Sequence, residues 1–218
     1  SGAVAVVRCM GSFLRVSAAV AKTFRYGVFG RSVNAMTRLL AVILASITLS
    51  FGAFAAKADE TRPHIDIVAI GSSLTQGYNL PPGTDFCAVL EQRLRAEGYD
   101  VTIVNAGVSG DTSAGGLARL DWALAGPVDG VMIELGSNDM LRGIEPDATE
   151  ANLEAILTRL KERGLPVHFS GMMAQRNLGP EYVAAFDGIY PRLAAKYGAI
   201  FYPFWLDGIA ADLSLNQA

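Results

Sequence analysis

Short apolar runs alternate with longer amphipathic runs through residues 59–218, and this alternation limits the possible folds more than any other feature. Most of the apolar runs are continuously apolar, which indicates strands that are covered on both faces. Five runs predict strands, at residues 64–71, 101–107, 130–136, 166–172 and 199–205. Four segments have apolar residues at helical spacing, and most of them end in glycine. They predict helices at residues 85–98, 113–126, 147–164 and 180–198.

Strands that alternate with helices imply right-handed crossovers between parallel strands. The expected fold class is therefore α/β, a three-layer α/β/α domain with a five-stranded, doubly wound parallel sheet of the flavodoxin-like kind. A chain of 218 residues is long enough for one such domain and short for two. Since ligands of these sheets bind beyond the carboxyl ends of the strands, we expect a functional site in the loops that follow them.

Residues 36–58 predict a secretory signal peptide. A short basic start at Arg38 precedes a predominantly apolar run, and two A-x-A sequences, ending at Ala55 and Ala58, are candidate cleavage sites. An uncleaved membrane anchor is the alternative, because residues 39–56 are just long enough to span a bilayer. With cleavage, we expect a periplasmic or secreted protein without a stable membrane span.

Residues 1–35 show no clear helical or strand periodicity, and we expect an upstream leader without a fold. An organellar transit peptide would share their basic, acid-poor composition, although the compact apolar run that follows fits export better. The expected organisation is thus a leader at 1–35, a signal peptide at 36–58 and a single domain at 59–218.

The predicted domain is acidic. All 21 Asp and Glu residues lie beyond Ala58, whereas 7 of the 18 Lys and Arg residues lie before it, which leaves a net charge of −10 in residues 59–218. Phosphate binding needs clustered Lys and Arg, so a nucleic-acid partner is disfavoured. Cys9 and Cys87 lie on either side of this divide, which excludes a disulfide within the domain, and Cys87 is expected to be a small buried apolar residue.

Polar motifs follow the first three predicted strands: Gly71-Ser72-Ser73-Leu74, Ser109-Gly110-Asp111-Thr112-Ser113 and Gly136-Ser137-Asn138-Asp139. A parallel sheet would bring all three to one edge. Together they can supply a serine hydroxyl, the backbone N–H of Gly110 and the side-chain amide of Asn138. These groups are the components of a nucleophile with an oxyanion hole.

Each motif taken alone also has an ordinary structural interpretation. Ser72 or Ser73 can cap a helix, because serine is strongly favoured at that position. The second motif can be an ordinary loop, in which one of residues 111–113 caps the helix that follows. The third can be an Asx-type turn, in which Asp139 bonds backbone N–H groups. The functional interpretation therefore depends on the three motifs occurring together.

The motifs resemble those of the SGNH, or GDSL-type, hydrolases, in particular the bacterial arylesterases and the thioesterase I/lysophospholipase L1 enzymes. The stretches "NAGVSGDTSAGGLARL" at residues 105–120 and "ELGSNDMLRGI" at residues 134–144 carry most of the resemblance. The segments "NLGPEY" and "YPFWLDG" follow in the same order as in that family. The likeness extends from about Asp66 to the end of the chain.

The resemblance implies that Ser73 is the nucleophile. The N–H groups of Ser73 and Gly110 and the side-chain amide of Asn138 would form the oxyanion hole. The sequence departs from the family at two positions: Ser72 stands where aspartate is usual, and Ser137 where glycine is often found. The first departure changes the hydrogen bonding of the loop and leaves the nucleophile in place.

The resemblance also implies a catalytic Asp and His, in a D-x-x-H motif shortly after the fifth strand. Because this chain ends at "LNQA", just before the expected motif, we expect a domain truncated at its C-terminus, without its last helix and nearly inactive. Neither histidine is expected to substitute: His64 precedes the first strand at the opposite edge, and His168 is interpreted as a core or sheet-face residue. Asp207 has Ala210 where a D-x-x-H would have its histidine, and it is interpreted as a turn residue.

The function implied by the resemblance is that of a serine ester hydrolase. It would act through an acyl-enzyme on a small-molecule acyl ester or thioester, with no metal and no organic cofactor. Two alternatives remain open at this point. One is a non-catalytic protein of the same fold that binds acyl or glycan ligands, and the other is an O-acyltransferase that uses the same serine.

Overall fold

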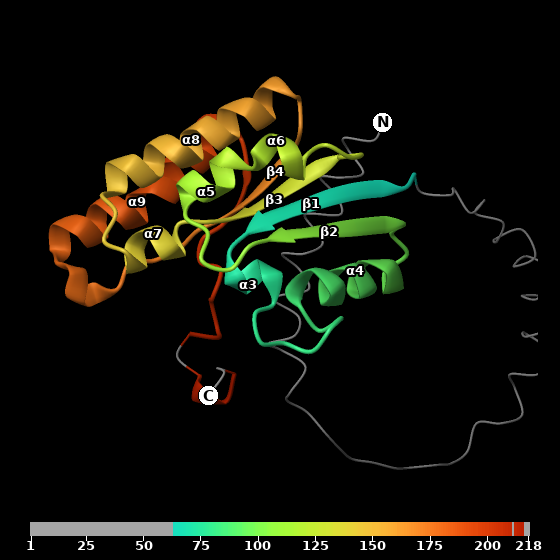
Figure 1. Cartoon of the computed structure of the whole chain (residues 1–218), viewed down its shortest axis with the longest axis horizontal. Coiled ribbons are helices and arrows are strands. Elements are labelled where there is room, and N and C mark those ends of the chain that lie inside the picture. The colour runs from blue at the N-terminus through green and yellow to red at the C-terminus, as the bar shows by residue number, and fades with distance from the viewer. Residues whose placement is uncertain (1–62, 211, 216–218) are drawn as a thin grey trace, which may run out of the picture. The chain divides into compact units, whose positions relative to one another are not determined.

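The computed structural model describes residues 63–210 and 212–215, so the leader and signal peptide predicted at residues 1–58 lie outside the described residues. Five parallel strands form one sheet in the order β2-β1-β3-β4-β5 (Figure 1). They are β1 (Ile65–Gly71), β2 (Val101–Gly107), β3 (Gly130–Glu134), β4 (Val167–Ser170) and β5 (Ile200–Tyr202). The predicted α/β class and doubly wound sheet are confirmed, and the strand order places the topological switch point beside β1.

Three of the four predicted helices are continuous: α4 (Phe86–Ala96), α8 (Pro146–Glu162) and α9 (Pro180–Tyr197). Each is followed within two residues by a glycine with positive φ, namely Gly98, Gly164 and Gly198. A residue with a side chain would be strained there, which explains the glycine at the end of each amphipathic run.

The fourth predicted helix, at residues 113–126, is wrong as a single element. Two short helices replace it, α5 (Ser113–Ala118) and α6 (Leu120–Ala123), and Arg119 lies between them. The described part also contains the short helices α3 (Ser73–Gln76) and α7 (Ser137–Leu141), and the 3-10 turns η1 (Arg176–Leu178) and η2 (Leu213–Leu215). Both α3 and α7 begin in the polar motifs that follow β1 and β3.

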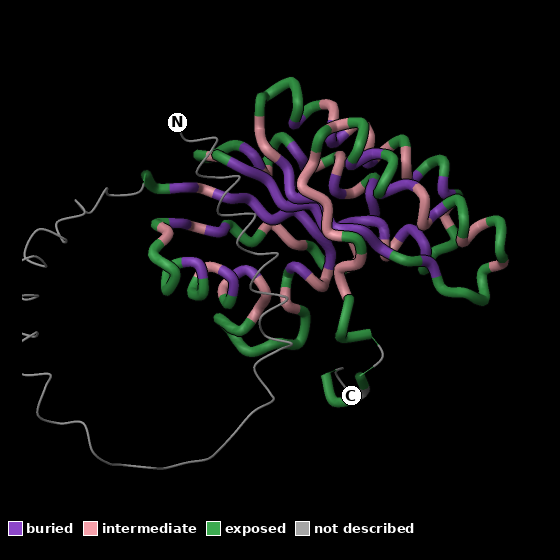
Figure 2. Tube along the Cα trace, turned by 180° about the vertical axis from the view of Figure 1, so that it is seen from behind, coloured by how far each residue is buried: buried purple, intermediate pink, exposed green. Residues whose placement is uncertain are grey.

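The sheet separates two hydrophobic clusters. On one face, Val68 and Ile133 pack in a large cluster with α6, α8 and α9. On the other face, Ile67 and Met132 pack with α4. Successive residues of a strand point to opposite faces, so a strand between two helical layers must be apolar throughout. Figure 2 shows this burial along the central strands.

The two edge strands are less buried than the central ones. The second half of β2 is partly open, with Val104 45% exposed, and all three residues of β5 are half-buried. The expectation of strands covered on both faces therefore holds for β1, β3 and β4, which lie in the middle of the sheet.

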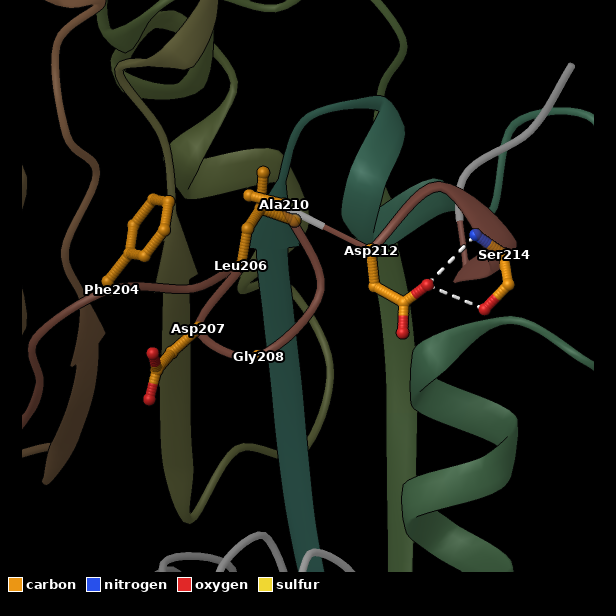
Figure 3. A pocket seen from close by; sticks show the side chains of 7 residues that line it. All are labelled: Phe204, Leu206, Asp207, Gly208, Ala210, Asp212 and Ser214. Carbon is orange, nitrogen blue, oxygen red and sulfur yellow. Dashed lines mark hydrogen bonds between the residues drawn. The ribbon is translucent and has the colours of Figure 1, made fainter.

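Beyond β5 the chain returns towards the start of α4. The ring of Trp205 lies 4.5 Å, centroid to centroid, from the ring of Phe86. The following turns enclose an open hollow of about 670 Å³, which Figure 3 shows with Asp207 and Ala210 on its wall. Across the described residues, no helix has both the length and the apolar character that a bilayer span requires.

Candidate active site

The loops after β1, β2 and β3 start side by side at the carboxyl edge of the sheet. Gly71, the last residue of β1, is in register with Gly107 of β2 and with Glu134 of β3. Val108 then donates its N–H to the carbonyl of Gly71 at 2.9 Å. The convergence of the three polar motifs expected from the parallel sheet is therefore present.

The two serines of the first loop have different environments. Ser72 is buried, and its hydroxyl accepts a 3.4 Å hydrogen bond from the N–H of Leu74, which makes Ser72 the N-cap of α3. Ser73 is the first residue of α3 and is partly exposed. Within the described residues, neither the hydroxyl nor the N–H of Ser73 has a hydrogen-bond partner, so both remain available to a ligand.

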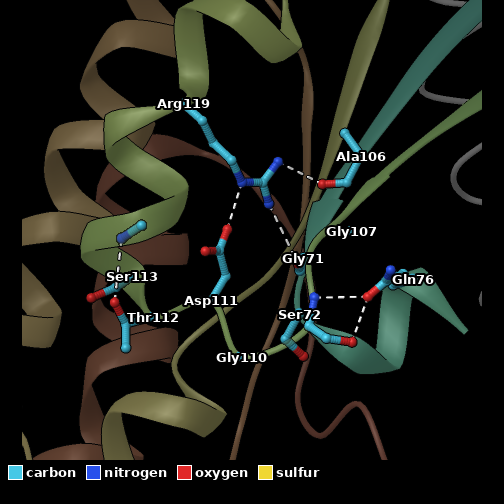
Figure 4. A network of polar contacts seen from close by, with 12 residues as sticks. Gly71, Ser72, Gln76, Ala106, Gly107, Gly110, Asp111, Thr112, Ser113 and Arg119 are labelled. Carbon is cyan, nitrogen blue, oxygen red and sulfur yellow. Dashed lines mark hydrogen bonds and ion pairs between the residues drawn. The ribbon is translucent and has the colours of Figure 1, made fainter. Parts of the chain in front are cut away.

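An arginine clamps the first loop to the second (Figure 4). The guanidinium of Arg119 donates to the carbonyl of Ala106 at 2.7 Å and to that of Gly71 at 3.1 Å. Its Nε donates to the carboxylate of Asp111 at 2.5 Å. Three separate donors on one planar group fix the geometry of the loop, because guanidinium offers its N–H groups in a rigid arrangement.

Gly110 lies in this clamped loop with φ +83°, a conformation that favours glycine. Its carbonyl accepts a 2.6 Å hydrogen bond from Arg142. Thr112 caps α5, which settles which of the three candidates in this motif is the cap.

The third loop is tied to the second by Asn138 and Asp139. The side-chain Nδ2 of Asn138 donates one hydrogen to the carbonyl of Asp111 at 2.9 Å, which leaves its second hydrogen for another acceptor. Asp139 is fully buried and accepts from the N–H of Ser113 at 2.7 Å and from the hydroxyl of Thr149 at 3.3 Å. Asp139 thus bonds a backbone N–H, as expected, and that N–H belongs to the neighbouring loop.

A buried carboxylate lies under the first loop. Glu134 is 2% exposed and accepts hydrogen bonds from the N–H of Ser72 at 2.9 Å and from the hydroxyl of Thr75 at 2.8 Å. Burial raises the pKa of Glu134 to about 7, against the effect of these hydrogen bonds, which lower it.

The remaining polar candidates have other surroundings. His64 precedes β1 and bonds Asp100 at 2.9 Å on the opposite side of the sheet. His168 is buried within β4, in register with Met132 and Ile200, and burial lowers its pKa to about 4. Asp207 lies in a turn, where its N–H donates to the carbonyl of Phe204 at 3.0 Å. All three positions agree with the sequence-based interpretation.

Sequence reasoning missed Glu134 and Arg119. For Glu134 there was a signal, a single charged residue inside an otherwise apolar strand, because a buried carboxylate needs partners. For Arg119 the sequence contained no such signal, since an arginine in an amphipathic segment is usually exposed to solvent. Cys87 is buried, as predicted, and burial raises its pKa to about 12, which disfavours the reactive thiolate form.

The chain is similar to known acyl hydrolases. Residues 69–217 match the GDSL-like Lipase/Acylhydrolase family. The chain is 39% identical over 153 residues to Esterase TesA of Pseudomonas aeruginosa, covering 70% of this chain and 76% of that protein. It is 34% identical over 144 residues to Thioesterase 1/protease 1/lysophospholipase L1 of Escherichia coli, covering 66% of this chain and 68% of that protein.

Among solved structures, AlinE4, an SGNH-hydrolase family esterase, superposes with a TM-score of 0.69 at 44% identity, covering 71% of this chain and 84% of that one. The strand order, the three motifs at one edge and these similarities agree with one another. The chain belongs to the GDSL-like lipase/acylhydrolase family.

Proposed function

We propose that this ester hydrolase works through Ser73, whose hydroxyl attacks the carbonyl carbon of an acyl ester or thioester. The resulting oxyanion is held by the N–H groups of Ser73 and Gly110 and by the free hydrogen of the Asn138 amide. Collapse of this intermediate expels the alcohol or thiol and leaves an acyl-enzyme, which water then hydrolyses. One observation carries the proposal: Asn138 is hydrogen-bonded to the loop that contains Gly110, and Arg119 joins that loop to the one that carries Ser73, whose hydroxyl makes no bond within the described residues.

Apolar side chains around the edge support an acyl substrate. Tyr78, Leu80, Val108, Leu141 and Met173 are between 40% and 63% exposed and lie in loops or short helices that follow four different strands. Apolar groups in the loops at this edge are available to contact an acyl chain. A small-molecule ester with an apolar acyl chain fits these surroundings, and the net charge of −10 in residues 59–218 disfavours a nucleic-acid partner.

The proton of Ser73 requires a base, and the two histidines of this sequence, His64 and His168, lie away from the three loops. The decisive experiment therefore assays p-nitrophenyl butyrate hydrolysis by two forms, these residues alone and the translation product of the complete reading frame. Comparing the forms tells whether the base lies within these 218 residues or is encoded outside them.

Ser73→Ala is expected to lower the turnover of the active form by about four to six orders of magnitude. In serine hydrolases the catalytic residues act as a unit, so removing the nucleophile abolishes the contribution of the whole unit. Thr158→Val is the matched control, since it removes a hydroxyl that bonds Tyr197 outside the three loops and keeps the nucleophile. Hydrolysis that survives Ser73→Ala would reject the assignment. Formation of a transfer product with an added alcohol, in place of free acid, would favour the acyltransferase, and ligand binding without turnover would favour the non-catalytic protein.

We also propose that residues 36–58 direct export to the periplasm or the medium, since two A-x-A sites follow an apolar run. N-terminal sequencing of the exported protein should begin at Ala56 or Asp59. An N-terminus before Met36 would contradict this.

A further inference from the structure

Glu134 joins the end of β3 to the turn that carries Ser73. Its carboxylate accepts from the N–H of Ser72 at 2.9 Å, from the hydroxyl of Ser72 at 3.0 Å and from the hydroxyl of Thr75 at 2.8 Å. Ser72 and Thr75 stand on either side of Ser73 in the sequence. One buried side chain therefore holds both flanks of the residue assigned as nucleophile.

The same carboxylate explains the glycine that begins the first motif. A Cβ on Gly71 would lie 2.0 Å from the hydroxyl oxygen of Thr75 and 2.8 Å from an oxygen of Glu134, closer than any side chain tolerates. The backbone φ of Gly71 is not positive, so conformational freedom does not account for this glycine. Gly71 is required because the hydrogen-bonded pair of Thr75 and Glu134 occupies the space beside it.

The three donors suit the ionised form of Glu134. Ionised carboxylate only accepts hydrogen bonds, and here three N–H or O–H groups donate to it. A protonated carboxyl group must donate its own hydrogen. The acceptors at hand are the hydroxyls of Ser72 and Thr75, so one hydroxyl would have to rotate and give up its own bond. Protonation of Glu134 thus changes the hydrogen bonding on a flank of Ser73.

The charge of Glu134 acts on two other titratable groups, Cys87 on α4 and Tyr190 on α9. Burial raises the pKa of Cys87 to about 12 and that of Tyr190 well above its ordinary value, so both stay neutral at ordinary pH. Neither of these two groups therefore changes charge together with Glu134, whose own pKa is raised to about 7 by burial.

Ser72 allows this arrangement. An aspartate at this position, as in the four letters after which the family is named, would bring a second carboxylate within reach of Glu134. Two buried carboxylates in contact retain a shared proton, because both cannot ionise together. The hydroxyl of Ser72 supplies a hydrogen in its place and leaves Glu134 as a single carboxylate.

We propose that Glu134 is a positioning residue for Ser73, acting through Ser72 and Thr75, and that its ionised form holds the nucleophile turn in the reactive geometry. This rests on the proposed role of Ser73. Glu134 touches neither the substrate nor the reacting atoms, so its effect falls on kcat while KM stays nearly unchanged.

The test compares wild type with Glu134→Gln, in which the amide mimics the protonated acid, in whichever form hydrolyses p-nitrophenyl butyrate. At pH 8.5 wild type should exceed the variant in kcat by roughly tenfold to a hundredfold, the size expected for a small misplacement of a reacting group. At pH 5.5 the two should converge. A ratio that is constant with pH indicates a merely structural role and overturns the proposal, as does a ratio of one throughout.

Milder variants test the same proposal if Glu134→Gln does not fold. Thr75→Val should lower kcat and Thr75→Ser should restore it, since serine keeps the hydroxyl. The matched control is Thr158→Val, which removes a comparable 2.8 Å bond to Tyr197 far from the three loops. Ser72→Asp should move the pH at which activity rises upward, and adding Glu134→Gln should cancel that shift. Equal losses in Thr75→Val and Thr158→Val would contradict the proposal.

Two measurements separate this inference from the proposed function. Amide exchange at residues 72–77 should accelerate in Glu134→Gln and Thr75→Val relative to α4, and stay unchanged in Thr158→Val, whether or not hydrolysis is detected. Carboxyl ¹³C NMR should show one glutamate that titrates near neutrality and whose signal disappears in Glu134→Gln. If Ser73→Ala stays active while these results hold, the nucleophile assignment fails and Glu134 still organises the turn. If exchange and titration are unchanged, the role of Glu134 is rejected.

Discussion

Asn138 is the side chain on which the assignment of the oxyanion hole can be tested most directly. One of its amide hydrogens is already held by the carbonyl of Asp111, so the other points in a fixed direction. A donor that is oriented before the substrate arrives stabilises the oxyanion without further ordering.

Replacing Asn138 with Ala is therefore expected to lower kcat by about 10²- to 10³-fold with a much smaller change in KM. Asn138→Asp keeps the shape and removes the donors, so it should lose at least as much activity. Steady-state kinetics on p-nitrophenyl butyrate give kcat and KM, and urea unfolding shows whether the variants remain folded. Nearly full activity in either folded variant would exclude Asn138 from the oxyanion hole.

The choice between Ser72 and Ser73 shows what a single residue's surroundings add to a motif. Both serines fit a helix cap from the sequence, and the structure gives the cap to Ser72. The hydroxyl of Ser72 also donates to Glu134, a residue 62 positions away. No local pattern reports a partner at such a distance, because it depends on which strands become neighbours.

The break between α5 and α6 is the clearest case in which an element differs from its sequence pattern. Apolar residues at helical spacing predict one helix over residues 113–126, yet Arg119 leaves the helical conformation at the centre. Its guanidinium reaches the carbonyls of Ala106 and Gly71, at the ends of β2 and β1. Hydrogen bonds from the charged guanidinium stabilise the fold more than the backbone hydrogen bonds of the helical turn that is lost at Arg119.

Arg119→Lys should destabilise the domain by about 1–3 kcal/mol, because an ammonium group cannot satisfy two carbonyls and the carboxylate of Asp111 in this geometry. It should also lower kcat, since Gly71 and Asp111 border the loops assigned to catalysis. Urea unfolding and ester hydrolysis measure the two effects. Arg163→Lys is the matched control, as Arg163 bonds only one carbonyl, that of Leu124, in the described part of the chain. Similar losses of stability in both variants would contradict the clamp.

The stability of the domain as a whole should depend on pH through Glu134. Its pKa is raised from an ordinary value of 4.5 to about 7, so between these values the folded state binds more protons than the unfolded state. Stability from this group is fully present below about pH 4.5 and is lost as pH rises through about 7. The loss is on the order of 3 kcal/mol, at roughly 1.4 kcal/mol for each pKa unit.

Urea unfolding at pH 5 and pH 8 measures this dependence. Wild type should lose more free energy of unfolding between the two values than Glu134→Gln does. His64, whose pKa is raised by Asp100, gives a slope of the same sign, and it contributes equally to both proteins. An identical loss in wild type and variant would show that Glu134 does not titrate in this window.

The sequence alone was sufficient to predict the layers of this domain. A strand between two helical layers is apolar at every position, and a helix on a sheet is apolar on one side, so both leave periodic signals in the chain. The five strands, three continuous helices and the edge that carries Ser73, Gly110 and Asn138 followed from those signals. The motifs also sufficed for the family, because the residues within each motif are contiguous in the sequence.

The contacts that organise this edge depended on the tertiary structure. Glu134 meets Ser72 only because β1 lies between β2 and β3, and Arg119 leaves its helix only because the ends of β1 and β2 lie within its reach. Periodicity reports whether a position is buried. It does not identify the partner that a buried polar group will meet, because that partner comes from another strand, brought near by the packing of the whole sheet.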